Sequence, residues 1–353
     1  SHGLCVFNGT IAIEIALRSC GIVPGDEVIV PPFTMSATVM APLIYGGIPV
    51  FADIEPETFC LNPTSVEQLI TTKTKAIIAV NLFGHPAELS RLKSIAERNN
   101  LWLIADNAQG PLSMEGDSLC GTIGDISIFS LNYHKHIHTG EGGMCLTNDD
   151  ELAQRLQLIR NHGENVIEDK KIGNLNNMVG FNYRMTELSA AVGIAQLSKI
   201  HQHVTSRESA MTRLSSELHD LEGLTPPVVR EDCRHVYYQW ALRFNEELIG
   251  VSREVFSKAL EAEGFPHFLG YVEPLYLLPV FQNLTFMGDE NFPFNLGSYE
   301  YKKGLCPVAE DMYENQLILF APCPYDLTDE LVSKLIKCVR RVYENRNELR
   351  VRF

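Results

Sequence analysis

Short runs of apolar residues alternate with amphipathic segments along the first 160 residues of the chain. The runs are almost continuously hydrophobic, which is typical of strands buried on both faces of a parallel sheet. The segments between them repeat apolar residues every three to four positions and predict helices. We predict strands at 4–7, 26–32, 48–53, 76–81, 101–105 and from 128, and helices at 11–21, 34–45, 66–71, 87–99 and 149–161. This alternation predicts an α/β fold with a mostly parallel sheet covered on both sides.

The pattern changes at about residue 205, where a helix predicted from Thr186 ends. Residues 235–244 resemble an antiparallel strand with aromatic side chains, and 252–264 predict a helix with a glycine stop. A long amphipathic helix follows the capping residue Thr328. We therefore predict a large domain of residues 1–205 and a small α+β domain of residues 206–353. Within the large domain, residues 163–180 are polar and rich in glycine and asparagine, and a loop of this length inside a compact domain is usually functional or disordered.

Composition narrows the class of protein. Hydrophobic residues make up 45% of the chain and charged residues 21%, as in ordinary globular proteins. The net charge of −15 argues against nucleic-acid binding, which needs surplus lysine and arginine. No apolar run approaches the roughly 18 residues of a membrane span. The start resembles no signal peptide, and the nine scattered cysteines without a CxxC pair suit a reducing compartment, so we expect a cytoplasmic protein. The abrupt start in an apolar run suggests that a leading segment is missing.

Polar side chains that can take part in binding or catalysis follow three of the predicted strands. Thr10, Asp106 and Lys135 each stand just after an apolar run, and the carboxyl ends of parallel strands are where ligands collect. The turn at 8–10 precedes a helix, so the N–H groups of Gly9, Thr10 and Ile11 predict an anion site. An ordinary strand–helix junction explains this turn equally well.

Lys135 lies between two apolar runs and is followed by a glycine-rich turn. A lysine in such a place is a poor choice for packing, and we interpret it as the amine that forms a Schiff base with an aldehyde cofactor. Such a cofactor with a pyridine ring needs a carboxylate at the ring nitrogen and donors around its phosphate. Asp106 supplies the carboxylate and Ser130 a hydroxyl, although alone they also fit a surface acid and an ordinary strand residue.

Three histidines flank this lysine, at positions 134, 136 and 138. In an extended chain they lie on the face opposite Lys135. A His-x-His-x-His run also fits a metal site. Because no carboxylate or cysteine cluster accompanies it, we favour bystander histidines and no metal.

Several stretches occur in an order and spacing that resemble a known family. They are NGT (8–10), PGDEVIVPPFT (24–34), PVFADIEPETFCLNP (49–63), TKAIIAVNLFGHPAE (74–88), ADNAQG (105–110), GTIGDISIFS (121–130), TGEGG (139–143) and GFNYRMTELSAAVGIAQL (180–197). Together they resemble the DegT/DnrJ/EryC1/StrS aminotransferases, pyridoxal-phosphate (PLP) enzymes that aminate keto sugars on nucleotide carriers. The last third matches more loosely, through 307–324. The resemblance implies the aspartate-aminotransferase (type I PLP) fold, with 1–205 as the cofactor-binding domain.

Roles for individual residues follow from the resemblance. It implies that Lys135 holds PLP as the internal aldimine and carries the proton, and that Asp106 pairs with the pyridine nitrogen. Gln109 lies near the ring and its phenolic oxygen. The residues implied for the phosphate are Gly9, Thr10 and Ser130. Met35 stands where the family often has an aromatic residue stacked on the ring, which is a departure.

The resemblance also implies partners and a reaction. Asn182 is expected to reach the phosphate of the neighbouring subunit's cofactor, so a homodimer shares its active sites. L-Glutamate converts PLP to the pyridoxamine form, which aminates a keto sugar nucleotide in deoxysugar biosynthesis for lipopolysaccharide or antibiotics. The GEGG turn resembles that of enzymes acting on a 4-keto-6-deoxy hexose. The alternatives are a cyclitol (inosose-type) or aminoshikimate-pathway aminotransferase, and a non-catalytic PLP-binding regulator, which loses residues of the site that this chain keeps.

Overall fold

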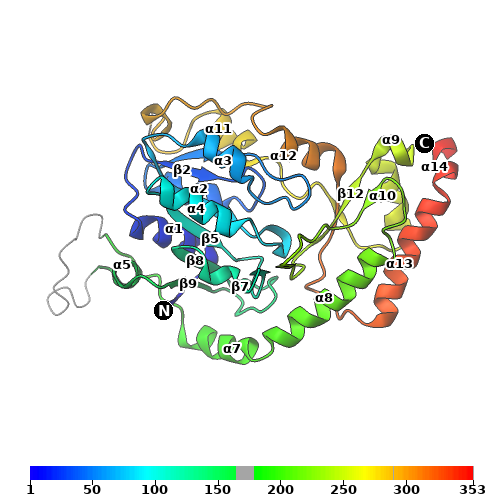
Figure 1. Cartoon of the computed structure of the whole chain (residues 1–353), viewed down its shortest axis with the longest axis horizontal. Helices are drawn as coiled ribbons and strands as arrows, with labels where there is room; N and C mark the ends of the chain where they lie inside the picture. Colours follow the sequence, from blue (N-terminus) through cyan, green and yellow to red (C-terminus); the bar gives the residue numbers. More distant parts are fainter. Residues whose placement is uncertain (164–178, 289, 353) are drawn as a thin grey trace.

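The computed structural model of the chain describes residues 1–163, 179–288 and 290–352 and is built around a seven-stranded sheet (Figure 1). Its order is β1-β9-β8-β5-β4-β2-β3, and the strands from β8 to β3 run parallel. β9 is antiparallel to both of its neighbours. The strands span His2–Val6 (β1), Glu27–Val30 (β2), Ile48–Phe51 (β3), Thr74–Val80 (β4), Trp102–Asp106 (β5), Ile126–Ser130 (β8) and Gly143–Thr147 (β9). The predicted α/β fold with a mostly parallel sheet is confirmed.

Helices of the first half pack against this sheet and against one another. They are α1 (Gly9–Ser19), α2 (Ala37–Ile44), α3 (Pro63–Leu69), α4 (Leu89–Arg98) and α5 (Asp150–Arg160). The helix α1 contacts β8 and β9, and α4 contacts β4 and β5. Because the sheet is covered, β2 and β3 are buried along their whole length, as their continuous apolar runs predicted. Gly21 follows the end of α1 with a φ of 82°, a left-handed conformation that glycine adopts without strain.

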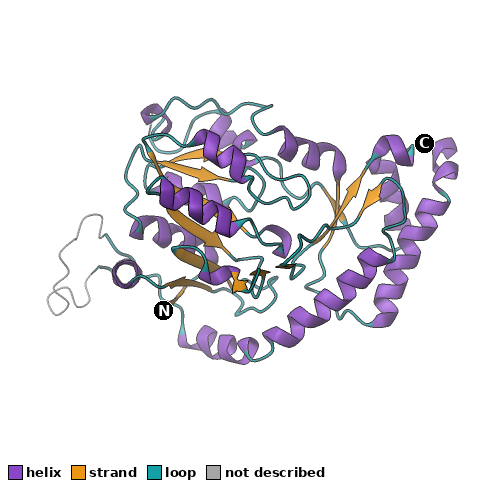
Figure 2. Cartoon of the chain, in the orientation of Figure 1, coloured by secondary structure: helices purple, strands orange, loops and turns teal. Residues whose placement is uncertain are grey.

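A second lobe lies on the other side of the molecule and contains mostly antiparallel strands (Figures 1 and 2). Two helices, α7 (Glu187–Leu197) and α8 (Ile200–Ser216), stand where one helix was predicted. The sheet of this lobe has the order β10-β12-β14-β13. Its strands are Leu224–Thr225 (β10), Trp240–Phe244 (β12), Phe268–Leu269 (β13) and Leu317–Phe320 (β14), and its helices are α9 (Glu246–Ile249), α10 (Arg253–Ala262), α13 (Asp329–Glu344) and α14 (Arg346–Arg352). Thr328 caps α13 as predicted, by accepting the N–H of Leu331.

Shorter elements connect the two lobes. A three-stranded sheet joins β6 (Met114–Glu115), β7 (Ser118–Leu119) and β11 (Cys233–Arg234), and the helices α11 (Pro279–Gln282) and α12 (Pro307–Asp311) follow later in the chain. The large core includes Phe281 and Met312, so this late segment packs with the first half. The other main core lies between the small sheet and the helices α8, α10 and α13.

The division at residue 205 falls inside α8 and remains a prediction. Most of the loop predicted at 163–180 lies outside the described residues. Within the described ranges, no helix is long and apolar enough to cross a membrane.

Candidate active site

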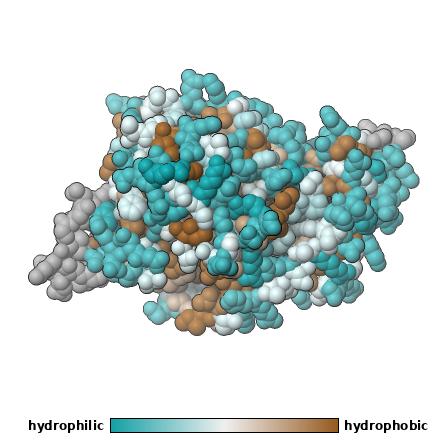
Figure 3. Space-filling model, viewed as in Figure 1, coloured by the Kyte–Doolittle hydropathy of each residue, from teal (hydrophilic) through white to brown (hydrophobic). Residues whose placement is uncertain are grey.

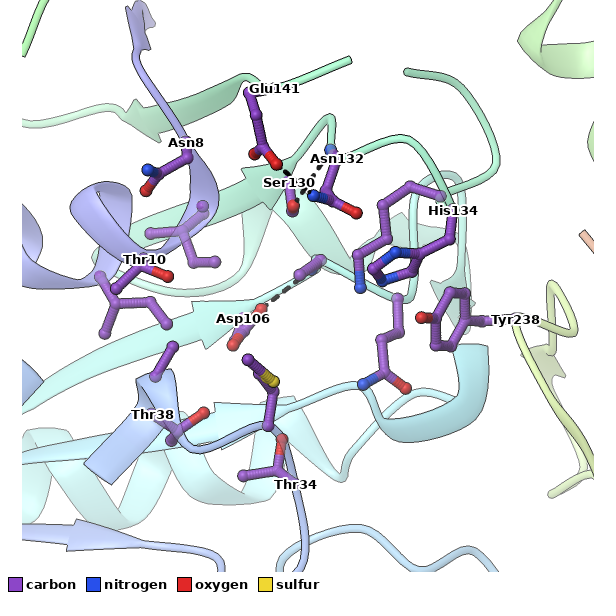
Figure 4. Close-up of a pocket in the computed structure, with 18 of the residues that line it drawn as sticks. Asn8, Thr10, Thr34, Thr38, Asp106, Ser130, Asn132, His134, Glu141 and Tyr238 are labelled. Carbon is purple, nitrogen blue, oxygen red and sulfur yellow. Dashed lines mark hydrogen bonds between the residues drawn. The ribbon is translucent and has the colours of Figure 1, made fainter. Parts of the chain in front are cut away.

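A cavity of about 520 Å³ opens where β5 and β8 end, beside the N-terminus of α1 (Figure 4). Small-molecule sites have volumes of about 300–1,000 Å³. The predicted site residues that line it are Gly9, Thr10, Met35, Asp106, Gln109, Ser130 and Lys135. Asn182 does not line this cavity. Residues from four separate parts of the chain therefore meet at one place, as the strand ends predicted.

Asp106 is the last residue of β5 and is buried, with 4% of its surface exposed. Its Oδ1 atom accepts the N–H of Ala108 at 2.9 Å. Burial raises the pKa of Asp106 to about 6, although this hydrogen bond and the charge of Lys135 act in the opposite direction. The side chain is therefore mostly ionised at neutral pH and presents a carboxylate to the cavity.

Lys135 is on a turn rather than in an extended segment, because its N–H donates to the carbonyl oxygen of Asn132 at 3.0 Å. Its Nζ atom lies 4.3 Å from the centroid of the Tyr238 ring. Burial lowers the pKa of Lys135 to about 8, while the carboxylate of Asp106 acts to raise it. A lysine with this pKa is partly a free amine near neutral pH, which is the nucleophilic form.

The same turn corrects the prediction for the histidines. His134 lies beside Lys135 and lines the cavity, whereas the extended arrangement had placed it on the opposite face. His136 is buried and donates its Nε2–H to the carbonyl oxygen of Val236 at 2.8 Å. His138 is exposed. The three rings therefore diverge, and among the described residues no group of three His, Cys, Asp or Glu side chains could hold a metal ion.

The N-terminus of α1 provides donors for an anion. Asn8 caps the helix and accepts the N–H of Ile11 at 2.9 Å, so the prediction of a free N–H group at Ile11 is wrong. Among the described residues, none accepts a hydrogen bond from the N–H groups of Gly9 and Thr10. These two groups lie at the positive end of the helix dipole, where negative charge is stabilised.

Glycine at position 9 lets Ser130 approach this helix terminus closely. A Cβ atom on Gly9 would lie 2.8 Å from the Cβ of Ser130 and 3.0 Å from its Oγ, so any larger residue would push the two segments apart. Ser130 is the last residue of β8, and the only hydrogen bond of its hydroxyl among the described residues comes from the N–H of Asn132, at a long 3.4 Å. A hydroxyl and two N–H groups thus form a small cradle that fits a phosphate.

Both polar atoms of the Gln109 side-chain amide make hydrogen bonds within the protein. The Oε1 atom accepts the N–H of Phe83 at 2.8 Å, and the Nε2 atom donates to the hydroxyl of Tyr271 at 3.0 Å. Tyr271 lines the cavity and has a φ of 77°, and burial raises its pKa to about 12. Gln109 therefore fixes a neutral tyrosine in the cavity wall. Met35 lies at the opening, with 59% of its surface exposed.

Tyr238 and Tyr271 also line the cavity, although the sequence pattern did not predict them as site residues. The strand predicted at 235–244 begins only at Trp240. Before it, Val236 donates its N–H to Gly84 and Gln239 donates to Phe83, so this segment follows the turn at 82–84 instead of the sheet. The aromatic run in the sequence was the only available signal, and it could not show this distant contact.

Asn182 is exposed and is not among the residues that line the cavity of its own chain. Its neighbour Tyr183 is anchored, since its carbonyl oxygen accepts the N–H of Phe7 at 3.0 Å and its hydroxyl donates to Glu14 at 2.9 Å. The segment with Asn182 is therefore fixed beside α1, and the side chain of Asn182 is exposed.

Comparison with known proteins adds to this geometry. The profile of the DegT/DnrJ/EryC1/StrS aminotransferase family matches residues 1–340. GDP-perosamine synthase of Caulobacter vibrioides is 37% identical over 288 residues, which are 80% of this chain and 75% of the relative. An aminotransferase from Psychrobacter cryohalolentis has a similar structure, with a TM-score of 0.86, 28% identity and coverage of 98% of this chain and 88% of the other. The NtdA protein of Bacillus subtilis, solved with bound cofactor PMP, has a TM-score of 0.80 and 28% identity, covering 98% of this chain and 74% of that one.

Proposed function

The chain belongs to the DegT/DnrJ/EryC1/StrS family of PLP-dependent aminotransferases, and we propose that it moves an amino group from L-glutamate to a keto sugar carried on a nucleoside diphosphate. The observation that supports this most strongly is the meeting of Lys135, a buried Asp106 and the anion cradle in one cavity. An amine, a carboxylate and phosphate donors are the groups that PLP requires.

The residues of the cavity fit this cofactor. Gly9, Thr10 and Ser130 would hold its phosphate, because their donors converge where only glycine permits the approach. Asp106 would pair with the pyridine nitrogen, and the fixed amide of Gln109 would lie near the ring. Met35 would pack on the ring, which a polarisable thioether can do. PLP then supplies an aromatic ring that withdraws the electrons of a broken Cα–H bond.

Lys135 has two roles in this proposal. Its Nζ atom would attach to the aldehyde carbon of the cofactor in the resting enzyme. Once released, the same amine would accept the proton of the donor amino acid and return it. Efficient proton transfer needs a group with a pKa near the working pH, and burial lowers the pKa of Lys135 to about 8.

For the acceptor we propose a 4-keto-6-deoxy hexose on a nucleoside diphosphate. The Gly140–Gly143 turn, which resembles that of enzymes acting at C4, supports this choice. The similarity to GDP-perosamine synthase supports a sugar on a nucleotide carrier. A cyclitol ketone is the second candidate, because the same cofactor chemistry serves any ketone that fits the cavity.

The acceptor can be tested with the pyridoxamine form of the enzyme, prepared by adding L-glutamate and removing 2-oxoglutarate. We expect a 4-keto-6-deoxy sugar nucleotide to restore the visible absorbance of the PLP form at least about tenfold faster than its 3-keto isomer. An inosose serves as the carbocyclic comparison. Faster turnover of the inosose, or no reaction with any sugar nucleotide, would contradict the proposed acceptor.

A homodimer with shared active sites forms part of the proposal. The helix α7 buries none of its residues in this chain, and four apolar side chains on it are exposed: Leu188, Val192, Ile194 and Leu197. Figure 3 shows apolar surface at the lower edge, where Figure 1 places α7. Exposed apolar patches of this kind mark interaction sites. We propose that a second copy covers α7 and that Asn182, just before it, reaches the partner's phosphate cradle.

Charges on α7 should separate the subunits. We expect the double variant Leu188→Asp/Ile194→Asp to be monomeric in light scattering and to bind PLP at least about tenfold more weakly. Leu248→Asp is the matched control, because Leu248 is similarly exposed but lies on α9 in the other lobe. Asn182→Ala should keep the dimer and still weaken PLP binding. A dimeric double variant with normal PLP affinity would exclude this interface.

A further inference from the structure

Tyr238 presents its ring to the amine of Lys135, with the Nζ atom 4.3 Å from the ring centroid. The proposed function of Lys135 gives no role to this contact. We propose that the face of Tyr238 holds the Lys135 ammonium group whenever the lysine is not bonded to the cofactor, so that Tyr238 is a positioning residue for proton transfer. This inference rests on the proposed function of Lys135.

The position of Tyr238 is fixed by its backbone. Gly84 has a φ of 95°, and a Cβ atom there would lie 2.9 Å from the backbone nitrogens of both Tyr237 and Tyr238. Gln239 donates its N–H to the carbonyl oxygen of Phe83 at 3.2 Å. The side chain of Tyr238 is itself buried, with 7% exposed. The backbone of Tyr238 therefore cannot shift without disrupting the turn at 82–84, and the packing around the buried ring restricts its rotation.

The ring, and not the hydroxyl group, makes this contact. Burial raises the pKa of Tyr238 above its ordinary value, so the hydroxyl stays protonated and offers no negative charge. An aromatic ring attracts a cation over its face through its quadrupole, and the attraction strengthens when water is excluded. Phenylalanine would provide the same face, whereas an aliphatic side chain would not.

The ring matters most when the cofactor is bound. Asp106 is the ionised group that raises the pKa of Lys135 in the free protein, but in the proposed function it pairs with the pyridine nitrogen. The other titratable groups around Lys135 do not replace the negative charge of Asp106. Burial keeps Cys323 a thiol by raising its pKa, and burial lowers the pKa of His134, which stays neutral. Tyr271 is neutral as well, and Glu141, whose carboxylate accepts the amide of Asn132 at 2.6 Å, is not among the charges that shift the pKa of Lys135.

The first test measures the protonation of Lys135 in the cofactor-free protein. Wild type, Tyr238→Phe and Tyr238→Leu are reductively methylated over a pH series, and mass spectrometry of the Lys135 peptide gives the midpoint. We expect the midpoint to fall by about 0.5 to 1 unit in the leucine variant, because the ring no longer stabilises the cation, and to stay unchanged in the phenylalanine variant. An unchanged midpoint in Tyr238→Leu, or an equal fall in Tyr238→Phe, would overturn the proposal. Tyr238→Met takes the place of the leucine variant if that one does not fold.

The second test uses PLP-loaded protein and follows exchange of the Cα proton of L-glutamate with solvent deuterium by NMR. We expect exchange about tenfold slower in Tyr238→Leu and normal in Tyr238→Phe, with covalent attachment of PLP to Lys135 retained in all three proteins. Exchange at the wild-type rate in Tyr238→Leu would overturn the role in proton transfer. If wild type itself does not attach PLP to Lys135, the proposed function fails, and that result is distinguishable because the methylation midpoints do not depend on PLP.

Discussion

Lys135→Ala is expected to abolish the visible absorbance of lysine-linked PLP and to slow amino transfer from L-glutamate at least about 10³-fold. General acid–base catalysis alone contributes roughly 10²–10⁴-fold, and this variant also loses the covalent attachment. Burial and the turn at 132–135 give Lys135 its reactive amine, and no other lysine lines the cavity among the described residues. Single-turnover absorbance measurements with glutamate give the rate.

Two controls separate loss of the amine from loss of the fold. Lys302→Ala removes an exposed lysine and should behave as wild type. Added methylamine should partly restore the Lys135→Ala reaction, because a small amine can enter the space left by the side chain. Persistence of both colour and turnover in Lys135→Ala would refute the assignment.

Asp106→Asn is expected to slow the same half-reaction about 10²–10³-fold, the loss typical of removing one group that stabilises transition-state charge. The asparagine cannot balance a positive charge on the pyridine nitrogen, so the ring withdraws electrons poorly. PLP should still attach, since Lys135 and the phosphate cradle remain. Stopped-flow absorbance after mixing with glutamate measures the step, and Asp117→Asn, an exposed acid, is the control. A rate within threefold of wild type would contradict the role of Asp106.

Although Asp106→Asn should slow the reaction, it should raise the thermal stability of the cofactor-free protein above about pH 6. Folding raises the pKa of Asp106 from 3.8 to about 6, so its ionised form is disfavoured in the folded state. The carboxylate therefore destabilises the fold above about pH 6 and has no such effect below the unfolded pKa. We expect cofactor-free Asp106→Asn to melt higher than wild type at pH 8 and to lose this advantage towards pH 4.

Much of the site was predictable because parallel strands end at a common edge of the sheet. Asp106 and Ser130 are the last residues of β5 and β8, and each follows an apolar run that marks its strand. Gly9 and Thr10 were predictable from the change of a strand into a helix. The resemblance to the family added roles to these positions. It also placed Gln109 and Met35, both of which line the cavity.

The remaining features depend on contacts between distant segments, which no local pattern encodes. The turn that brings His134 beside Lys135 has no strong glycine or proline signal, and the period of two suggested an extended chain. Tyr238 reaches the cavity because its segment bonds to the turn at 82–84. The break between α7 and α8 at 198–199 falls within a continuous apolar pattern, so one helix was predicted there. The apolar residues of α7 read in the sequence like those of a buried helix. Only the fold shows that this helix is exposed.

Reduction of the PLP-loaded protein with borohydride, followed by proteolysis and mass spectrometry, tests the central claim most directly. Borohydride converts the bond between a lysine amine and the cofactor's aldehyde carbon into a stable amine, so the modified residue can be identified. The account predicts a pyridoxyl phosphate group on Lys135 alone in the wild-type protein. It predicts no modified lysine in Lys135→Ala, in which Asp106 is unchanged. A modified lysine elsewhere in the chain, or no modified lysine in a protein that transfers amino groups, would contradict it.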